Sequence, residues 1–113
     1  LHRARLVVVL GHTQCGAILS TIEALNQPAD DQARKLRSIV DRVRPSVEML
    51  METEVGKNRD ELIRHSVRNN IRMSVNQLRR GSAALEHLIE HEGLRVVGAE
   101  YSLETGVVEF FNY

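Results

Sequence analysis

The residues best suited to chemistry are a histidine and a cysteine three positions apart, within the segment Gly11-His12-Thr13-Gln14-Cys15-Gly16. Imidazole and thiolate are both good zinc ligands, and this spacing allows both to reach one ion. The flanking glycines lack side-chain bulk, so the backbone can come close to an ion or a small ligand. The segment therefore predicts a metal site with His12 and Cys15 as two of its ligands.

The same two residues allow other interpretations. The spacing H-x-x-C also arises by chance, and an isolated cysteine near a strand end is often a small buried hydrophobe. Cys15 is also a candidate nucleophile with His12 as its base, although no third group that would orient the base can be named. The choice between these interpretations depends on the elements around the segment.

The predicted elements on either side favour a site. Residues 6–10 form a continuous apolar run, typical of a strand buried on both faces of a parallel sheet. Apolar residues at helical spacing predict a helix over residues 17–25. Sites in open α/β sheets gather at the carboxyl ends of strands. Cys15 is expected in the first helical turn, where free N–H groups and the helix dipole favour the thiolate, the form that binds metal.

Further helices are predicted downstream. Asp30 and Asp31 favour the start of one helix, and Pro45 is expected to break or kink it. Asn58 with Glu61 has the spacing of a capping box at the start of the longest helix. Gly81-Ser82 is expected to end that helix and to cap another.

The last predicted helix contains the pattern H-x-x-E-H over residues 87–91, which also occurs in some zinc peptidases. Leu85, Leu88 and Ile89 are expected to face inward, and Gly93 to end the helix. Histidines in the last turn interact favourably with the helix dipole. We therefore interpret the histidines at positions 87 and 91 as residues of a solvated helix face rather than as a peptidase centre.

The order of elements predicts the fold class α/β: a Rossmann-like, mostly parallel sheet with flanking helices and a C-terminal antiparallel hairpin. Residues 94–101 and 107–111 are the hairpin strands, with a turn at Thr105-Gly106. A single buried strand at 6–10 needs neighbours for its backbone groups, so we expect a central strand to be missing at the N-terminal side. The predicted domain is single and covers residues 1–113.

Composition limits the partners and the compartment. Lysine plus arginine equals aspartate plus glutamate at 15 each, so no net field favours nucleic acid or a membrane surface, and we expect neither as a partner. The longest apolar run, residues 6–10, is too short to span a bilayer, and no signal peptide pattern is present. The single cysteine fits a reducing compartment, which predicts a cytoplasmic location.

Three blocks of the chain, in order, resemble the β-class carbonic anhydrases. Residues 6–17 look like the family's strand that delivers a histidine and a cysteine to zinc. Residues 67–71 resemble the family's helix, with Asn70 at its characteristic asparagine, and residues 94–108 resemble its closing hairpin. Ser102 replaces the family's usual aspartate, and Gly81-Ser82-Ala83 replaces its Ser-Pro helix start. We expect both departures to affect local turn and cap geometry rather than chemistry.

The resemblance implies reversible hydration of carbon dioxide to bicarbonate and a proton at a Zn²⁺ ion. His12 and Cys15 are the implied zinc ligands, Gly16 is expected to line the substrate pocket through its backbone, and a homodimer or higher homo-oligomer is implied. The family's remaining block is a cysteine with an aspartate and an arginine two and four residues later, and this sequence has no match to it.

Catalytic zinc normally takes three protein ligands. The third ligand, and the catalytic aspartate–arginine pair, are therefore expected outside this sequence, which corresponds to the C-terminal half of the family. The alternative is a non-catalytic carbonic-anhydrase-like interaction or regulatory module without a complete zinc site.

Overall fold

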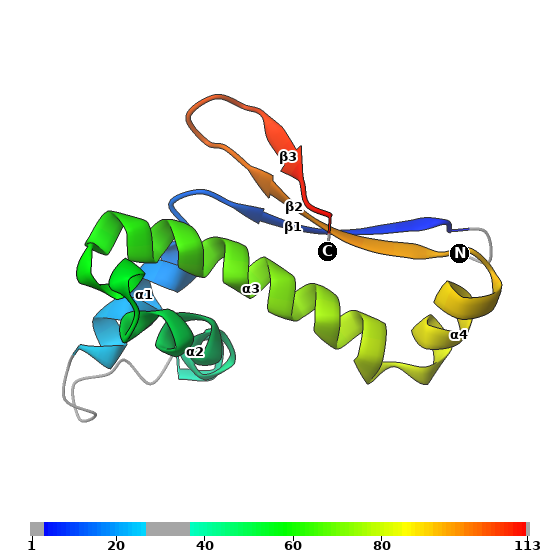
Figure 1. Ribbon diagram of the computed structural model, residues 1–113, viewed down its shortest axis with the longest axis horizontal. Helices are drawn as coiled ribbons and strands as arrows, with labels where there is room; N and C mark the ends of the chain where they lie inside the picture. Colours follow the sequence, from blue (N-terminus) through cyan, green and yellow to red (C-terminus); the bar gives the residue numbers. More distant parts are fainter. Residues whose placement is uncertain (1–3, 27–36, 113) are drawn as a thin grey trace. The chain divides into compact units, whose positions relative to one another are not determined.

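The computed structural model describes residues 4–26 and 37–112 (Figure 1). These residues form two compact units. The first unit contains the described residues up to His12 together with those from Ile71 onward, and the second runs from Thr13 to Asn70.

The first unit is built on a three-stranded sheet with the order β1-β2-β3. Strand β1 (Leu6–His12) pairs in parallel with β2 (Arg95–Tyr101), and β2 pairs antiparallel with β3 (Val108–Phe110). Figure 1 shows β1 and β2 running side by side and β3 turning back along β2. The mostly parallel sheet and the C-terminal hairpin confirm the predicted α/β class.

The prediction that the first strand is buried on both faces is wrong for the described residues. Side chains of β1 alternate between exposed and half-buried, and Leu6 and Leu10 are 53% and 58% exposed. The register places Tyr101, Val108 and Phe110 on the same face of the sheet, and all three are exposed. β1 lies at the end of the described sheet, where it has one paired neighbour.

The other face of the sheet carries the core of this unit. Val96 is buried on β2, and Ile71 and Val75 are buried on the part of α3 (Arg59–Gly81) that belongs to the same unit. The Arg79 guanidinium, one turn further along, donates a hydrogen bond to the carbonyl of Val96. A charge-assisted hydrogen bond therefore links this part of α3 to the sheet.

Helix α4 (Ala83–His91) begins as predicted, because the Ser82 hydroxyl accepts a hydrogen bond from the Leu85 N–H at 3.2 Å. Its end is also as expected, since Gly93 follows with a φ of 72°. The expected inward packing holds only in part: Leu85 and Ile89 are half-buried, Leu88 is 37% exposed, and no residue of α4 is fully buried. The helix is short and has one weakly apolar side, so the described residues cover it only in part.

The second unit is helical. Helix α1 (Gly16–Leu25) confirms the helix predicted after the first strand, and it packs against α2 (Arg37–Met51). The contact buries one side of each helix. The residues that are at most 8% exposed on these helices are Ile18, Thr21, Ile22, Ala24, Val40, Val43, Ser46 and Val47. The expected helix start at Asp30 and Asp31 lies outside the described residues.

Of the break or kink expected at Pro45, the break does not occur, because α2 continues through this residue. Proline removes one backbone N–H and so frees the carbonyl of Asp41. Both Asp41 and Pro45 are exposed, so water can satisfy that carbonyl. Val43 and Val47 on either side are buried, and this packing holds the helix together across the proline.

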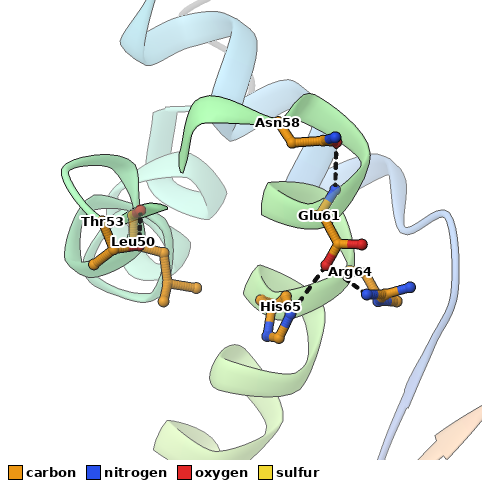
Figure 2. A network of polar contacts seen from close by, with 6 residues as sticks. All are labelled: Leu50, Thr53, Asn58, Glu61, Arg64 and His65. Carbon is orange, nitrogen blue, oxygen red and sulfur yellow. Dashed lines mark hydrogen bonds and ion pairs between the residues drawn. The ribbon is translucent and has the colours of Figure 1, made fainter. Parts of the chain in front are cut away.

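The segment between α2 and α3 is a tight connection through the 3₁₀ helix η3 (Glu54–Lys57). The Thr53 hydroxyl donates to the Leu50 carbonyl at 2.7 Å at the end of α2 (Figure 2). A Cβ at Gly56 would lie 2.0 Å from the Met51 carbonyl oxygen, so only glycine fits there.

The N-terminus of α3 has the cap that the sequence predicts. The Asn58 side-chain oxygen accepts a hydrogen bond from the Glu61 N–H at 3.1 Å. The reciprocal half of a capping box is absent between these two residues: the Asn58 N–H donates to Val55, and the Glu61 carboxylate contacts Arg64 and His65 instead (Figure 2).

Asn70, which the sequence placed on the apolar face of the longest helix, joins α3 to α2. Its side-chain oxygen accepts a hydrogen bond from the Ser46 hydroxyl at 3.0 Å, and Ser46 is 1% exposed. The neighbouring Asn69 amide donates to the Ser46 carbonyl at 2.9 Å. Asn70 thus fixes helix packing within the second unit.

Within the described parts of the chain, none of the helices combines the length and the apolar character that crossing a bilayer requires.

Candidate metal centre

His12 is the last residue of β1 and is exposed to solvent. It pairs in register with Tyr101, the last residue of β2, so two parallel strands end at this position. The carboxyl end of parallel strands is where ligand sites form in open α/β sheets. The structure therefore places His12 where the sequence predicted a site.

Cys15 is the N-cap residue of α1, with an extended backbone at φ −65° and ψ 121°. The expectation that it lies in the first helical turn is wrong by one residue, because the helix begins at Gly16. The Cys15 carbonyl accepts the first hydrogen bond of the helix, from the Leu19 N–H at 3.0 Å. Its thiol makes no cap hydrogen bond, forms no disulfide and is half-buried rather than sealed in the core. The interpretation of Cys15 as a fully buried hydrophobe does not hold in this structure.

Gln14, between the two candidate ligands, has a φ of 54°. This left-handed conformation is uncommon for a residue with a Cβ. Among the described residues, Gln14 is the only one other than glycine with a positive φ. Strained backbone of this kind concentrates at functional sites, so an observed outlier here supports a functional role for the turn. The residue type does not indicate this conformation, since glutamine is not among the residues that favour positive φ.

We expect Gln14→Gly to have a higher free energy of unfolding than Gln14→Ala, by about 1 kcal/mol. Both changes remove the same side-chain contacts, so the difference isolates the strain that a Cβ causes at positive φ. Urea titrations followed by circular dichroism measure it. Equal stabilities, or a more stable alanine variant, would show that the left-handed turn is not formed.

Gly16 is the first residue of α1 and is exposed. A Cβ built at this position meets no atom within 4 Å among the described residues. The backbone at Gly16 is therefore open on the side where a side chain would stand. This openness is what a residue that lines a pocket through its backbone requires.

His12 and Cys15 provide an imidazole and a thiol, the donor types that zinc prefers. Only Thr13 and Gln14 separate them in the chain. Over residues 4–26 and 37–112, no group of three or more histidine, cysteine, aspartate or glutamate side chains is placed to hold a metal ion. The donors fit zinc in type, but these residues offer two ligands where a catalytic site takes three.

Comparison with known proteins identifies a family. The sequence model described as carbonic anhydrase matches residues 2–108. A carbonic anhydrase of Mycolicibacterium smegmatis is 35% identical over 105 residues, which are 92% of this chain and 48% of that protein. Carbonic anhydrase 2 of Mycobacterium tuberculosis is 33% identical over 102 residues, which are 89% of this chain and 46% of that protein.

Solved structures show the same fold. A β-carbonic anhydrase of Aspergillus fumigatus superimposes with a TM-score of 0.82 at 22% identity, covering 97% of this chain and 50% of the other. A tetrameric β-carbonic anhydrase of Sordaria macrospora gives a TM-score of 0.79 at 17% identity, covering 96% of this chain and 53% of the other. The chain thus spans about half the length of the relatives and structures that it matches.

Proposed function

This chain belongs to the β-class carbonic anhydrase family, and we propose that His12 and Cys15 are two ligands of a catalytic zinc ion in reversible carbon dioxide hydration. The observation that carries the proposal is the placement of the two residues. His12 ends β1 at the carboxyl edge of the sheet, and Cys15 starts α1 after a turn with a left-handed residue. The match to the family runs through both residues.

The third zinc ligand and the aspartate–arginine pair come, in this proposal, from the half of the family that this sequence does not include. Two observations support it. The described residues hold no third ligand in place, and the matched relatives are about twice as long as this chain. The open edge and the exposed face of β1 provide a surface against which further chain can pack.

Each residue has a defined task in this proposal. Zinc supplies a Lewis acid that activates water at neutral pH. Cys15 and His12 hold the ion, and the half-buried position of Cys15 limits access of bulk solvent to the sulfur. The open backbone of Gly16 borders the space in which carbon dioxide or bicarbonate is bound.

We also propose a homo-oligomer, a dimer at least. The tetrameric relative from Sordaria macrospora supports this assembly. The apolar side chains exposed on the sheet form a surface that needs a cover, whether from the missing half or from a second subunit.

Gly16→Ala tests the role of Gly16 in the substrate pocket. The new methyl group meets no described atom, and alanine is favoured over glycine in a helix by about 1 kcal/mol. We therefore expect unchanged or slightly higher stability together with a several-fold rise in KM for carbon dioxide. Stopped-flow hydration assays, made on this chain joined to the N-terminal half of a relative as described in the next paragraph, measure KM, and urea titrations measure stability. An unchanged KM would remove Gly16 from the pocket.

The experiment that tests the function joins this chain to the N-terminal half of the Mycolicibacterium smegmatis relative, which corresponds to the part of the family not included here. We call this protein the fusion. We expect the fusion to hold one zinc per chain and to hydrate carbon dioxide, whereas the 113-residue chain binds zinc weakly and does not. Metal analysis and stopped-flow assays measure both properties.

The second candidate function is the non-catalytic module, which the single cysteine and the missing third ligand favour. A fusion that is folded but free of zinc and inactive would support the module and contradict the enzyme.

A further inference from the structure

We propose that α4 carries a second divalent-metal site, formed by His87 and His91. The proposal does not depend on the zinc site at His12 and Cys15, and it assigns a function to the histidine pair that hydration chemistry does not use. The ligand class is a first-row transition ion of the imidazole-binding kind, with nickel or copper as the strongest binders.

The geometry of the pair carries the proposal. His87 and His91 are four residues apart on α4, so they stand on the same face one turn apart. Their ring centroids are 4.7 Å apart, with the ring planes tilted by 43°. Rings this close can direct one nitrogen each toward a common ion, and the same i, i+4 spacing holds metal in helical zinc sites.

The exposure of the two imidazoles and their fixed spacing on one helix also favour metal binding. Both imidazoles are exposed, and α4 has no buried residue, so an ion reaches them without any opening of the core. The helix holds the two histidines on one face, one turn apart, before the ion arrives. The second imidazole therefore binds at a high effective concentration, which strengthens a two-ligand site.

The charge around the pair attracts a cation. Residues 83–92 contain Glu86, Glu90 and Glu92 and no lysine or arginine. One of these carboxylates is directly beside the pair, since a Glu90 oxygen lies 3.8 Å from His91 Nε2. The carboxylates add negative charge at the place where a divalent ion would bind.

The site differs from a peptidase centre in its number of ligands. Along the described chain no third metal ligand joins the pair in a suitable arrangement, so water completes the coordination. Calcium and magnesium prefer oxygen ligands and are not expected. Nickel and copper accept two imidazoles together with water.

Nickel titration of the untagged 113-residue chain by isothermal calorimetry tests the proposal. We expect one nickel ion to bind at α4, and both His87→Ala and His91→Ala to weaken this binding by at least about tenfold, since each leaves a single imidazole. His65→Ala is the matched control, because His65 is also an exposed helical histidine near a glutamate but has no histidine one turn away. It should bind nickel as the parent chain does.

His12→Ala distinguishes this site from the zinc site. The proposal is supported if both α4 variants weaken nickel binding and His12→Ala does not. The proposal is overturned if His12→Ala removes nickel binding, or if His87→Ala and His91→Ala leave it intact. Circular dichroism confirms that the exposed substitutions keep the helix content. Zinc content of the fusion is measured separately, so the proposed zinc site and the proposed nickel site are tested independently of each other.

Discussion

Replacing Cys15 with serine in the fusion should remove most of the bound zinc and lower carbon dioxide hydration by more than about 100-fold. Loss of a residue that only supports a zinc ligand typically costs 10–100-fold in affinity or activity, so loss of a direct ligand should cost more. Serine keeps nearly the same volume but replaces the thiolate with a hydroxyl, a much poorer zinc donor. Metal analysis after dialysis and stopped-flow hydration measure the two losses.

Two further variants make this result specific. His12→Ala should have the same effect as Cys15→Ser, because both residues are proposed to hold the same ion. His65→Ala should have neither effect, because His65 lies on the exposed side of α3 beside Glu61. A Cys15→Ser fusion that keeps one zinc per chain would contradict the assignment of Cys15 as a ligand.

Shortening Ile22 to alanine should lower the free energy of unfolding by about 2–5 kcal/mol. Ile22 is 1% exposed on α1, in the contact with α2 that holds the helix bearing Cys15. Folded domains are stable by only about 5–15 kcal/mol, so this loss is a large share of the total. Urea titration measures the change, and Ile22→Val should lose only about 0.5–1.5 kcal/mol.

The matched control is Ile39→Ala, the same chemical change at a residue of α2 that is 45% exposed. It should change stability by about 0.5 kcal/mol or less. If Ile39→Ala cost as much as Ile22→Ala, the packing of α1 against α2 described above would be incorrect.

The elements that the sequence predicted well are those set by local patterns. The helix after the first strand, the caps at Asn58 and Ser82 and the hairpin with Gly106 follow from residue types that act within a few positions. The continuous apolar run at residues 6–10 indicates a parallel sheet without naming the partner strand, and β1 pairs in parallel with β2.

The predictions that failed depend on contacts far apart in the sequence. Burial of β1 on both faces requires a cover that the described residues do not supply. Pro45 stays inside α2 because Val43 and Val47 are buried on either side of it, which the local effect of proline does not reveal. Leu88 faces solvent because no described element covers that side of α4.

In the candidate centre, too, the features set by local sequence were predictable and those set by distant contacts were not. The spacing of His12 and Cys15 and their place between a strand and a helix were visible in the sequence, and the structure puts them at those ends. The left-handed Gln14 was not visible, because it depends on how the chain turns from β1 into α1. A third ligand could not be named from the sequence, because Cys15 is its single cysteine and the proposal takes that ligand from outside these residues.

X-ray absorption at the zinc edge of the fusion, compared with that of its Cys15→Ser variant, shows whether the Cys15 sulfur binds the zinc ion. We expect both sulfur, at about 2.3 Å, and nitrogen, at about 2.0–2.1 Å, around the ion, with one sulfur fewer in the variant. An unchanged number of sulfur ligands in the Cys15→Ser variant would show that Cys15 does not bind the zinc.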